Sequence, residues 1–319
     1  MRSIRLLNLA LIFAVGGIWT VNGVLAQGEQ APPPPATAEA AKPQAATLPA
    51  SSGVKLPSPV VLPMREGSVK IAVIGDTGSG KPEQFEVGRM LNTYQIAFPF
   101  DSVLMVGDNI YGPEKAHDMK AKFEDAYQSM LDKGVKFYAS LGNHDGSNQR
   151  FYQHFNMNGE EYYKLEKGGV SFYALNSNYM DKRQLEWFTT RLAEDTNKWK
   201  IAFFHHPPFS SGKFHGSDES LRKVLHPIFV KHGVDVVFTG HDHFYERIKP
   251  QDGITYFVAG SSGQLRKGGV KKNSPLTAAA FDQDMTFMLV EIAGDELHFQ
   301  ALTRTGQTID SGVIKRRGA

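Results

Sequence analysis

Five short apolar runs, each followed by a polar residue, recur between residues 71 and 243. They read IAVIGD (71–76), VLMVGD (103–108), FYASLGNH (137–144), IAFFHH (201–206) and VVFTGHDH (236–243). Short runs rich in β-branched and aromatic residues and bounded by glycine predict buried strands. In four of the five runs a glycine precedes the polar residue, which favours a sharp turn out of the sheet. Because ligands of open α/β sheets bind at the carboxyl ends of the strands, the pattern predicts Asp, Asn and His side chains along one sheet edge.

The same pattern predicts how strands and helices follow one another. Strands are expected at 69–75, 102–107, 136–141, 199–204 and 234–239, with a hairpin over 160–176. Helices are expected near 83–96, 115–132, 181–196 and 218–232, whereas 253–315 reads as consecutive strands. A half in which helices and strands alternate, followed by a run of strands, predicts an α/β (α+β) fold. We expect a four-layer αββα sandwich, in which helices flank two mixed β-sheets.

The first 66 residues differ from the rest of the chain. Residues 1–26 combine Arg2, Arg5, an apolar stretch and a Val24-Leu25-Ala26 cleavage site, which predicts a signal peptide. An uncleaved membrane anchor is the alternative, but we expect cleavage and no stable membrane insertion afterwards. Residues 27–66 hold nine of the 17 prolines and predict a Pro/Ala-rich disordered linker. The folded domain is therefore expected over 67–319, exported to the periplasm or secreted.

Composition narrows the partners and the chemistry. The 35 basic and 33 acidic residues leave a net charge of +2 without a basic stripe, so no nucleic-acid polymer is expected as a partner. The chain has no cysteine, which excludes disulfides, thiolate zinc sites and cysteine nucleophiles and, in an exported protein, fits a bacterial periplasm. The groups at the strand ends are oxygen and imidazole donors. At least seven of them converge, more than one ion needs, so the sequence predicts two metal ions.

Five motifs carry these donors in a fixed order: GDTG (75–78), GDNIY (107–111), GNHD (142–145), FFHHPPFS (203–210) and GHDH (240–243). In order and spacing they resemble the calcineurin-like metallophosphoesterases. Many members have Asp-x-His in the first motif, where this chain has Gly78. The second motif instead offers Tyr111, three residues after Asp108. This exchange of a histidine for a tyrosine resembles the purple acid phosphatases, in which the phenolate binds iron(III).

The resemblance implies two sets of metal ligands. Iron(III) would be held by Asp76, Tyr111 and His243, and a divalent ion, Fe(II), zinc or manganese, by Asn143, His205 and His241, with Asp108 bridging both ions. Taken singly, the residues have plainer interpretations. Either aspartate fits a loop acid that caps a helix, and the tyrosine fits a packed aromatic side chain. The joint pattern favours the metal site.

Five more residues near the motifs have expected roles. His206 competes with His205 as a ligand, and we prefer His205 because it precedes Pro207 by two residues, as in the family pattern. The resemblance implies that His144 contacts phosphate and that His215 contacts phosphate or protonates the leaving oxygen. Glu246 and Arg247, which follow the last motif, are expected to form a local ion pair.

The leading hypothesis is an acid phosphatase that hydrolyses phosphate monoesters, with a metal-bound hydroxide as the nucleophile of a binuclear Fe(III)–M(II) centre. Its expected partner is a small phosphate-ester substrate, and the sequence indicates no oligomeric state. Relatives with the same site hydrolyse phosphodiesters or nucleotides, which is the second hypothesis. The third, from another class, is a non-catalytic, metal-stabilised binding protein tethered at the cell envelope. Against it stands the complete set of ligand positions.

Overall fold

The computed structural model describes residues 55–318, so the predicted signal peptide and the predicted linker up to residue 54 lie outside the described part. Its helices are α1 (Pro82–Ala97), α2 (Ala116–Met119), η1 (Lys120–Glu124), α3 (Asp125–Leu131), η2 (Ser147–Phe151), η3 (Gln153–Phe155), α4 (Lys182–Glu194) and α5 (Glu219–His232). Its strands are β1 (Val69–Ile74), β2 (Ser102–Met105), β3 (Lys136–Ala139), β4 (Tyr163–Lys167), β5 (Val170–Ala174), β6 (Trp199–Phe203), β7 (Val236–Thr239), β8 (Tyr245–Ile248), β9 (Thr255–Ala259), β10 (Thr277–Phe281), β11 (Thr286–Ala293), β12 (Glu296–Thr303) and β13 (Thr308–Lys315). Among these residues, no helix has the length and apolar character needed to cross a bilayer.

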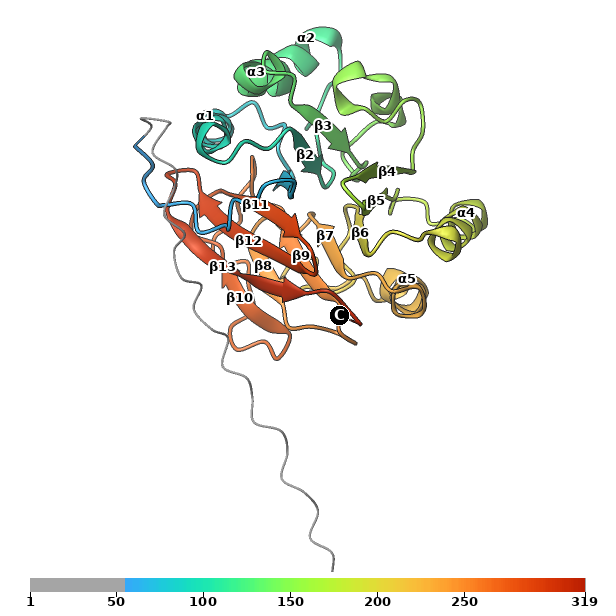
Figure 1. The fold of residues 1–319 in the computed structure, drawn as a ribbon. Helices are drawn as coiled ribbons and strands as arrows, with labels where there is room; N and C mark the ends of the chain where they lie inside the picture. Colours follow the sequence, from blue (N-terminus) through green and yellow to red (C-terminus); the bar gives the residue numbers. More distant parts are fainter. Residues whose placement is uncertain (1–54, 319) are drawn as a thin grey trace, which may run out of the picture. The chain divides into compact units, whose positions relative to one another are not determined.

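Two mixed sheets form the centre of the fold (Figure 1). One has six strands in the order β13-β12-β11-β1-β2-β3, with β1, β2 and β3 parallel and β11 antiparallel to β1. The other has seven strands in the order β10-β8-β9-β7-β6-β5-β4, with β5, β6, β7 and β9 parallel. Parallel neighbours send their carboxyl ends to the same edge, so the loops after β1, β2, β3, β6 and β7 can carry one site.

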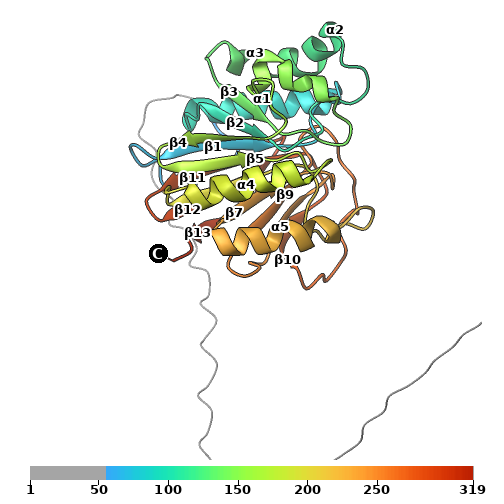
Figure 2. The same ribbon diagram turned by 90° about the vertical axis from the view of Figure 1, so that its right-hand side faces the viewer.

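The two sheets pack face to face, and helices cover their outer faces (Figure 2). The layer between the sheets is apolar, with Ile71, Leu104, Phe203 and Phe257 among its members. Outside the six-stranded sheet, α1 and α3 bury Val87, Leu91 and Tyr127; outside the other, α4 and α5 bury Phe188, Leu225 and Phe229. Strands covered on both faces are buried along their length, which explains why β7 and β9 read as continuous apolar runs. The predicted four-layer sandwich is confirmed.

The predicted elements agree with the structure; the hairpin expected over 160–176, for example, is formed by β4 and β5, in which Tyr163 lies opposite Ala174. There are two differences. The helix expected near 115–132 is continuous but contains the π-helical turn η1, so it divides into α2, η1 and α3. The stretch 253–315 holds β9 to β13, yet a loop over 260–276 interrupts it. That loop reads GSSGQLRKGGVKKNSPL, and its glycines and polar residues explain why no strand runs through it.

The packed part of the chain begins before the boundary predicted at residue 67. Val60 and Leu62 are each 1% exposed and belong to the apolar cluster beneath α1 and α3. The backbone N–H of Val61 donates a hydrogen bond to Oε1 of Gln300 at 3.1 Å. The last part of the predicted linker is therefore part of the fold. The apolar residues between its prolines are removed from water when they pack against the sandwich.

Candidate metal centre

The seven predicted metal ligands lie together at the carboxyl edge of the two sheets. Asp76 follows β1, Asp108 and Tyr111 follow β2, Asn143 follows β3, His205 follows β6, and His241 and His243 follow β7. The two aspartates, the tyrosine and the asparagine come from the six-stranded sheet, and the three histidines from the seven-stranded sheet. The centre therefore spans the junction between the sheets.

The backbone at three of these residues adopts the left-handed conformation. The φ angles are 53° at Asp76, 50° at Asp108 and 70° at His241. For residues other than glycine such angles cost about 1 kcal/mol or more and persist where the surroundings impose them, often at functional sites. Gly142 shows how tightly the loops meet, since a Cβ there would lie 2.2 Å from Oδ1 of Asp108. The turns aim these side chains inward and leave no room for a larger residue at 142.

The first ligand set surrounds the Tyr111 hydroxyl. This oxygen lies 3.2 Å from Oδ1 of Asp76, 3.0 Å from Oδ2 of Asp108 and 3.2 Å from Nε2 of His243. Nε2 of His243 in turn lies 3.3 Å from Oδ1 of Asp76. Asp76 is buried, whereas Tyr111 and His243 are partly exposed, so the set has one open side.

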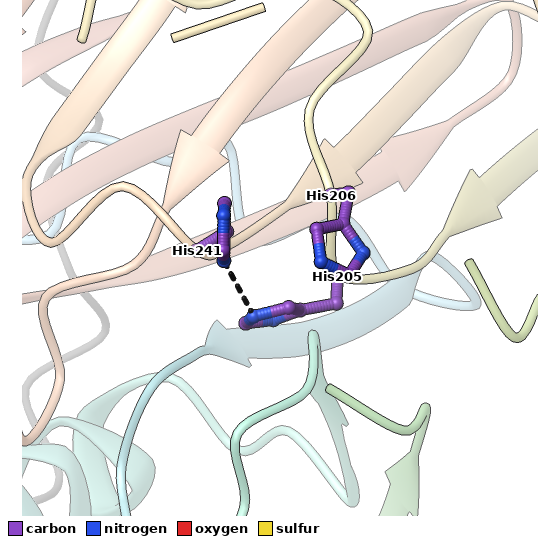
Figure 3. Close-up of side chains that lie close together, drawn as sticks. All are labelled: His205, His206 and His241. Atoms are coloured by element: carbon purple, nitrogen blue, oxygen red, sulfur yellow. Dashed lines mark hydrogen bonds between the residues drawn. The ribbon is translucent and has the colours of Figure 1, made fainter. Parts of the chain in front are cut away.

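The second ligand set surrounds Nε2 of His205, and Figure 3 shows His205 beside His241. This nitrogen lies 3.1 Å from Nδ1 of His241, 3.1 Å from Oδ1 of Asn143 and 3.4 Å from Oδ1 of Asp108. Asp108 therefore faces the first set with one carboxylate oxygen and the second set with the other. That is the arrangement expected of a bridging carboxylate.

The spacings within both sets match those of neighbouring ligands around a metal ion. Bonds of about 2.0–2.2 Å from the metal to nitrogen or oxygen place donors at a right angle roughly 3.0 Å apart, and donors at a tetrahedral angle roughly 3.4 Å apart. The donors here are 3.0 to 3.4 Å apart. The side chains already have a spacing that suits two ions.

The protonation pattern also fits a cation. Nδ1 of His205 lies 3.0 Å from the carbonyl of Val106, which can only accept, so Nδ1 carries the proton and Nε2 is left with its lone pair in the neutral ring. Burial lowers the pKa of His205, but the carboxylates of Asp76 and Asp108 outweigh it and raise the pKa to about 9. Burial and the neighbouring histidine rings lower the pKa of His241 to about 2, which keeps its ring neutral. A metal ion would replace the proton on His205.

The phenol of Tyr111 can ionise only if a cation is bound next to it. Burial, followed by the charges of Asp76 and Asp108, raises the pKa of its phenol well above the ordinary value. Without a metal the hydroxyl therefore stays protonated and donates to the carboxylates. A bound ion reverses this pKa shift, because its charge is the largest one nearby.

The two predicted catalytic histidines stand one beside each ligand set, and both are exposed. The N–H of His144 donates to Oδ1 of Asp108 at 2.9 Å, and its ring lies 4.9 Å from that of Tyr111. The ring of His215 lies 4.1 Å from that of His241. Both imidazoles can therefore reach a group bound at the centre.

His206 lies next to the second ligand set, with one ring nitrogen within 4.8 Å of ligand atoms of His205 and His241. Its Nδ1 lies 2.9 Å from Oγ of Ser177, and its ring lies 4.5 Å from that of His241. Burial and the neighbouring His205 lower the pKa of His206 to about 4. Beside it opens a cleft of about 410 Å³, whose lining includes Asn143, Ser177, Asn178, Tyr179, His206 and Asp218. The geometry favours His205 as the ligand and His206 as part of the wall of this cleft.

Asp145, whose role the motif did not reveal, connects two of the ligand loops. Its carboxylate accepts hydrogen bonds from the backbone N–H groups of Asn109, Ile110 and Gly142, at 2.8, 3.1 and 2.8 Å. Burial and the charge of Asp108 raise the pKa of Asp145 to about 7. This side chain fixes the loop after β2 against the loop after β3. Its position next to His144 was the available signal, but the sequence does not show which way it points.

The ion pair predicted between Glu246 and Arg247 is wrong. These neighbours lie on β8, where successive side chains point to opposite faces of the sheet. Arg247 pairs with Asp310 of β13 at 2.8 Å. Glu246 is fully buried and accepts a hydrogen bond from the N–H of Ser211 at 2.8 Å and one from the hydroxyl of Thr277 at 2.5 Å. It supports the loop that carries His215.

Comparison with known proteins agrees with the geometry. The family model for calcineurin-like phosphoesterases matches residues 69–245, more than half of the chain. The chain belongs to the calcineurin-like phosphoesterase family. This phosphoesterase is similar to tartrate-resistant acid phosphatase type 5 from Oryctolagus cuniculus, with 26% identity over 248 residues, covering 63% of the chain and 76% of the relative.

Solved structures share the fold of the phosphoesterase. Purple acid phosphatase PPD1 from yellow lupin (Lupinus luteus) matches with a TM-score of 0.66 and 18% identity, covering 81% of this chain and 55% of that one. GAP50, the anchor in the inner membrane complex of Plasmodium, matches with a TM-score of 0.68 and 18% identity, covering 78% and 89%. The predicted resemblance to purple acid phosphatases is confirmed, and the chain is a metal-dependent phosphoric ester hydrolase.

Proposed function

We propose that this phosphoesterase is a purple-type acid phosphatase, which hydrolyses small phosphate monoesters outside the cytoplasm. The observation that carries the proposal is the position of the Tyr111 hydroxyl, 3.0–3.2 Å from Asp76, Asp108 and His243. A phenolate is a hard, strong donor that suits iron(III). The second set, with Asn143, His205 and His241, accepts Fe(II), zinc or manganese.

When bound, the two ions supply a hydroxide nucleophile in mild acid and neutralise the charge of the phosphate. Asp108 would hold both ions, because its two oxygens face one ligand set each. The orientation of Asp108 is fixed by a hydrogen bond of 2.9 Å that its Oδ1 accepts from the backbone N–H of His144. The side chain can therefore bridge without turning, which keeps the centre rigid.

The exposed histidines act on the substrate rather than on the metals. The ring of His144, beside Tyr111, is placed to donate a hydrogen bond to a phosphate oxygen. The ring of His215, 4.1 Å from the ring of His241, is placed to protonate the leaving alkoxide.

The test uses purified protein expressed with iron. We expect visible absorption from the iron phenolate and release of phosphate from an aryl phosphate near pH 5. Asp108→Asn should abolish both, whereas Asp125→Asn, which changes an exposed acid on α3, should leave both unchanged. A colourless protein that takes up no iron and releases no phosphate would sink the proposal.

Two alternatives remain as outcomes of the same work. A phosphodiesterase or nucleotidase would prefer a diester or nucleotide over the monoester in a substrate panel. A non-catalytic binding protein gains some support from the structural match to GAP50, which is an anchor. The contacts within both ligand sets favour catalysis instead. If Asp108→Asn lowers stability while the wild type shows no turnover on any ester, the binding role is favoured.

Export is part of the proposal and has its own test. It is supported by the signal peptide predicted over residues 1–26. Fractionation of cells that express the full chain should place the protein, shortened by the signal peptide, in the periplasm or the medium. Retention of the full-length chain in the cytoplasm would contradict this.

A further inference from the structure

Two loops beside the metal centre are joined into one unit. The first, 210–217, carries His215, and the second is the loop over 260–276. Gly212 and Val270 form an antiparallel bridge. On either side of it, the N–H of Lys213 donates to the carbonyl of Gly269 and the N–H of Lys271 to the carbonyl of Ser211, both at 2.8 Å. The loops therefore behave as a short ribbon rather than as two free segments.

Buried carboxylates hold this ribbon from below. Asp242, between the two ligand histidines that follow β7, accepts hydrogen bonds from Oγ of Ser210 at 2.5 Å and from the N–H of Gly216 at 3.1 Å. Glu246 accepts the N–H of Ser211. Because both acceptors are buried, the ribbon has a fixed place relative to the metal ligands.

The ribbon borders the centre directly. The N–H of Arg266 donates to the carbonyl of His243 at 2.9 Å. The guanidinium carbon of Arg266 lies 4.6 Å from the ring centre of Phe214, the residue before His215. Gly216 is the residue after His215, and a Cβ at Gly216 would lie 3.9 Å from Nζ of Lys271. Cationic side chains therefore flank the exposed histidine on both sides.

The ribbon is strongly basic. No acidic residue occurs between Asp252 and Asp282 in the sequence. We define the cationic rim as Lys213, Arg266, Lys267, Lys271 and Lys272. Within residues 55–318, none of the five has a carboxylate partner within 4.0 Å. Some basic side chains elsewhere in the fold have such partners, for example Arg247 with Asp310 and Arg304 with Asp284.

We propose that the cationic rim binds a second phosphate of the substrate, so that the preferred substrates are small molecules with two or more phosphate groups. This rests on the proposed function, because one phosphate must lie at the metal centre while the other reaches the rim. The planar guanidinium of Arg266, which lies over the ring of Phe214, suits a bidentate contact with phosphate oxygens. Lysines within about 10 Å add attraction that salt only partly screens.

The experiment compares two phosphonates that the enzyme cannot hydrolyse. Butane-1,4-bisphosphonate and butylphosphonate differ by one anionic group, and calorimetry on the metal-loaded protein measures the affinity for each. We expect the bisphosphonate to bind at least about ten-fold more tightly to the wild type, by direct and long-range attraction. In Arg266→Gln/Lys271→Gln that preference should fall to about two-fold or less.

The matched control is Lys198→Gln/Lys231→Gln, which removes two exposed lysines at the opposite sheet edge, before β6 and at the end of α5. It should keep both the preference and the aryl phosphatase activity. Thermal melting of each variant shows whether it is folded.

Each outcome has a distinct meaning. An equal preference for the bisphosphonate in the wild type and in Arg266→Gln/Lys271→Gln overturns the proposal. The proposal is also overturned if the wild type shows no preference for the bisphosphonate but binds phosphatidylglycerol vesicles through Arg266 and Lys271. The rim would then bind a lipid surface. A retained, rim-dependent preference in a protein without turnover of aryl phosphate supports the rim and refutes the phosphatase function.

Discussion

The backbone N–H of Tyr111 donates a hydrogen bond of 3.0 Å to the carbonyl of Gly78. Ile110, the residue before it, forms a parallel bridge with Gly78. A Cβ at residue 78 would lie 2.0 Å from the carbonyl oxygen of Asn109. The contact that positions Tyr111 therefore leaves no space for a side chain at residue 78. In this chain the same close contact both positions Tyr111 and excludes a histidine side chain at residue 78.

Tyr111→Phe should leave the fold intact and remove the visible absorption of the iron-loaded protein. The ring remains to fill its space beside His144, but the oxygen that faces both aspartates is lost. We expect kcat/KM for an aryl phosphate to fall by about 100-fold or more. Metal analysis, the visible spectrum and steady-state kinetics measure the three effects. Tyr162→Phe, which changes a ring packed on Trp187, is the control and should alter none of them.

Gly78→Ala should destabilise the protein because the new methyl group meets the backbone of Asn109. Overpacking of this kind costs about 1–3 kcal/mol. Urea unfolding of the metal-free protein measures the loss, and the shift of the iron phenolate band in the loaded protein reports on Tyr111. A loss below about 0.5 kcal/mol with an unchanged band would contradict the steric argument.

Ser210→Ala should lower activity through His215. The Ser210 hydroxyl donates to Asp242 and accepts the N–H of Gly212, so its loss loosens the loop that carries His215. We expect kcat to fall by about three- to ten-fold in the wild-type background and by less than about two-fold in His215→Ala. Equal effects in the two backgrounds would show that Ser210 acts elsewhere.

Glu246→Gln should change how stability depends on pH. Burial, the main cause, raises the pKa of Glu246 above its ordinary value of 4.5. As pH rises past that value, the unfolded chain releases this proton before the folded one does, so the wild type loses stability until the folded carboxyl also ionises. Glutamine removes this effect.

The difference in Tm, Glu246→Gln minus wild type, should therefore increase as pH rises from 4.5 through the raised pKa of the folded protein. Thermal melts of both proteins from pH 4 to 8 measure it. A constant difference would show that the carboxyl is ionised equally in both states, and a difference that decreases with pH would show that folding lowers its pKa; either result contradicts the prediction.

Metal removal should destabilise the protein. Asp76 and Asp108 are at most 1% exposed and face each other across Tyr111, so the empty centre contains two buried carboxylates with few cationic partners. Ions that bind only the folded state add about 4 kcal/mol at a thousand-fold excess over Kd. Dialysis against a chelator should lower Tm, and reloading should restore it. An unchanged Tm after verified metal loss would contradict the assignment.

The donors of the centre could be predicted because each follows an apolar run and lies in a short motif. Residues such as Asp76 and His241 are placed by the ends of β1 and β7, which the apolar pattern reveals. Asp145 and Glu246 could not be assigned, because their roles depend on which loops meet in space. Glu246 shows the limit well, since its partner Thr277 lies 31 residues away, on a strand paired with its own.

The fold, like the site, could be predicted where local sequence patterns determine it. Buried parallel strands and amphipathic helices have local signatures, so the sandwich was predictable. The packing of Val60 and Leu62 was not, because nearby prolines suggest an extended linker whether or not the chain docks. Docking depends on partners such as Gln300, which lies far along the sequence.

Each of the two proposed ions draws ligands from both sheets. Asp76 and Tyr111 approach from one sheet and His243 from the other, while Asn143 meets His205 and His241 across the same junction. The other contacts between the sheets are mainly apolar, with a few directed ones such as the Arg247–Asp310 pair, and apolar contacts tolerate sliding far better than directed bonds do. A chain whose sheets docked out of register would present neither ion with a complete set of donors. Metal content therefore reports on the correct assembly of the whole sandwich.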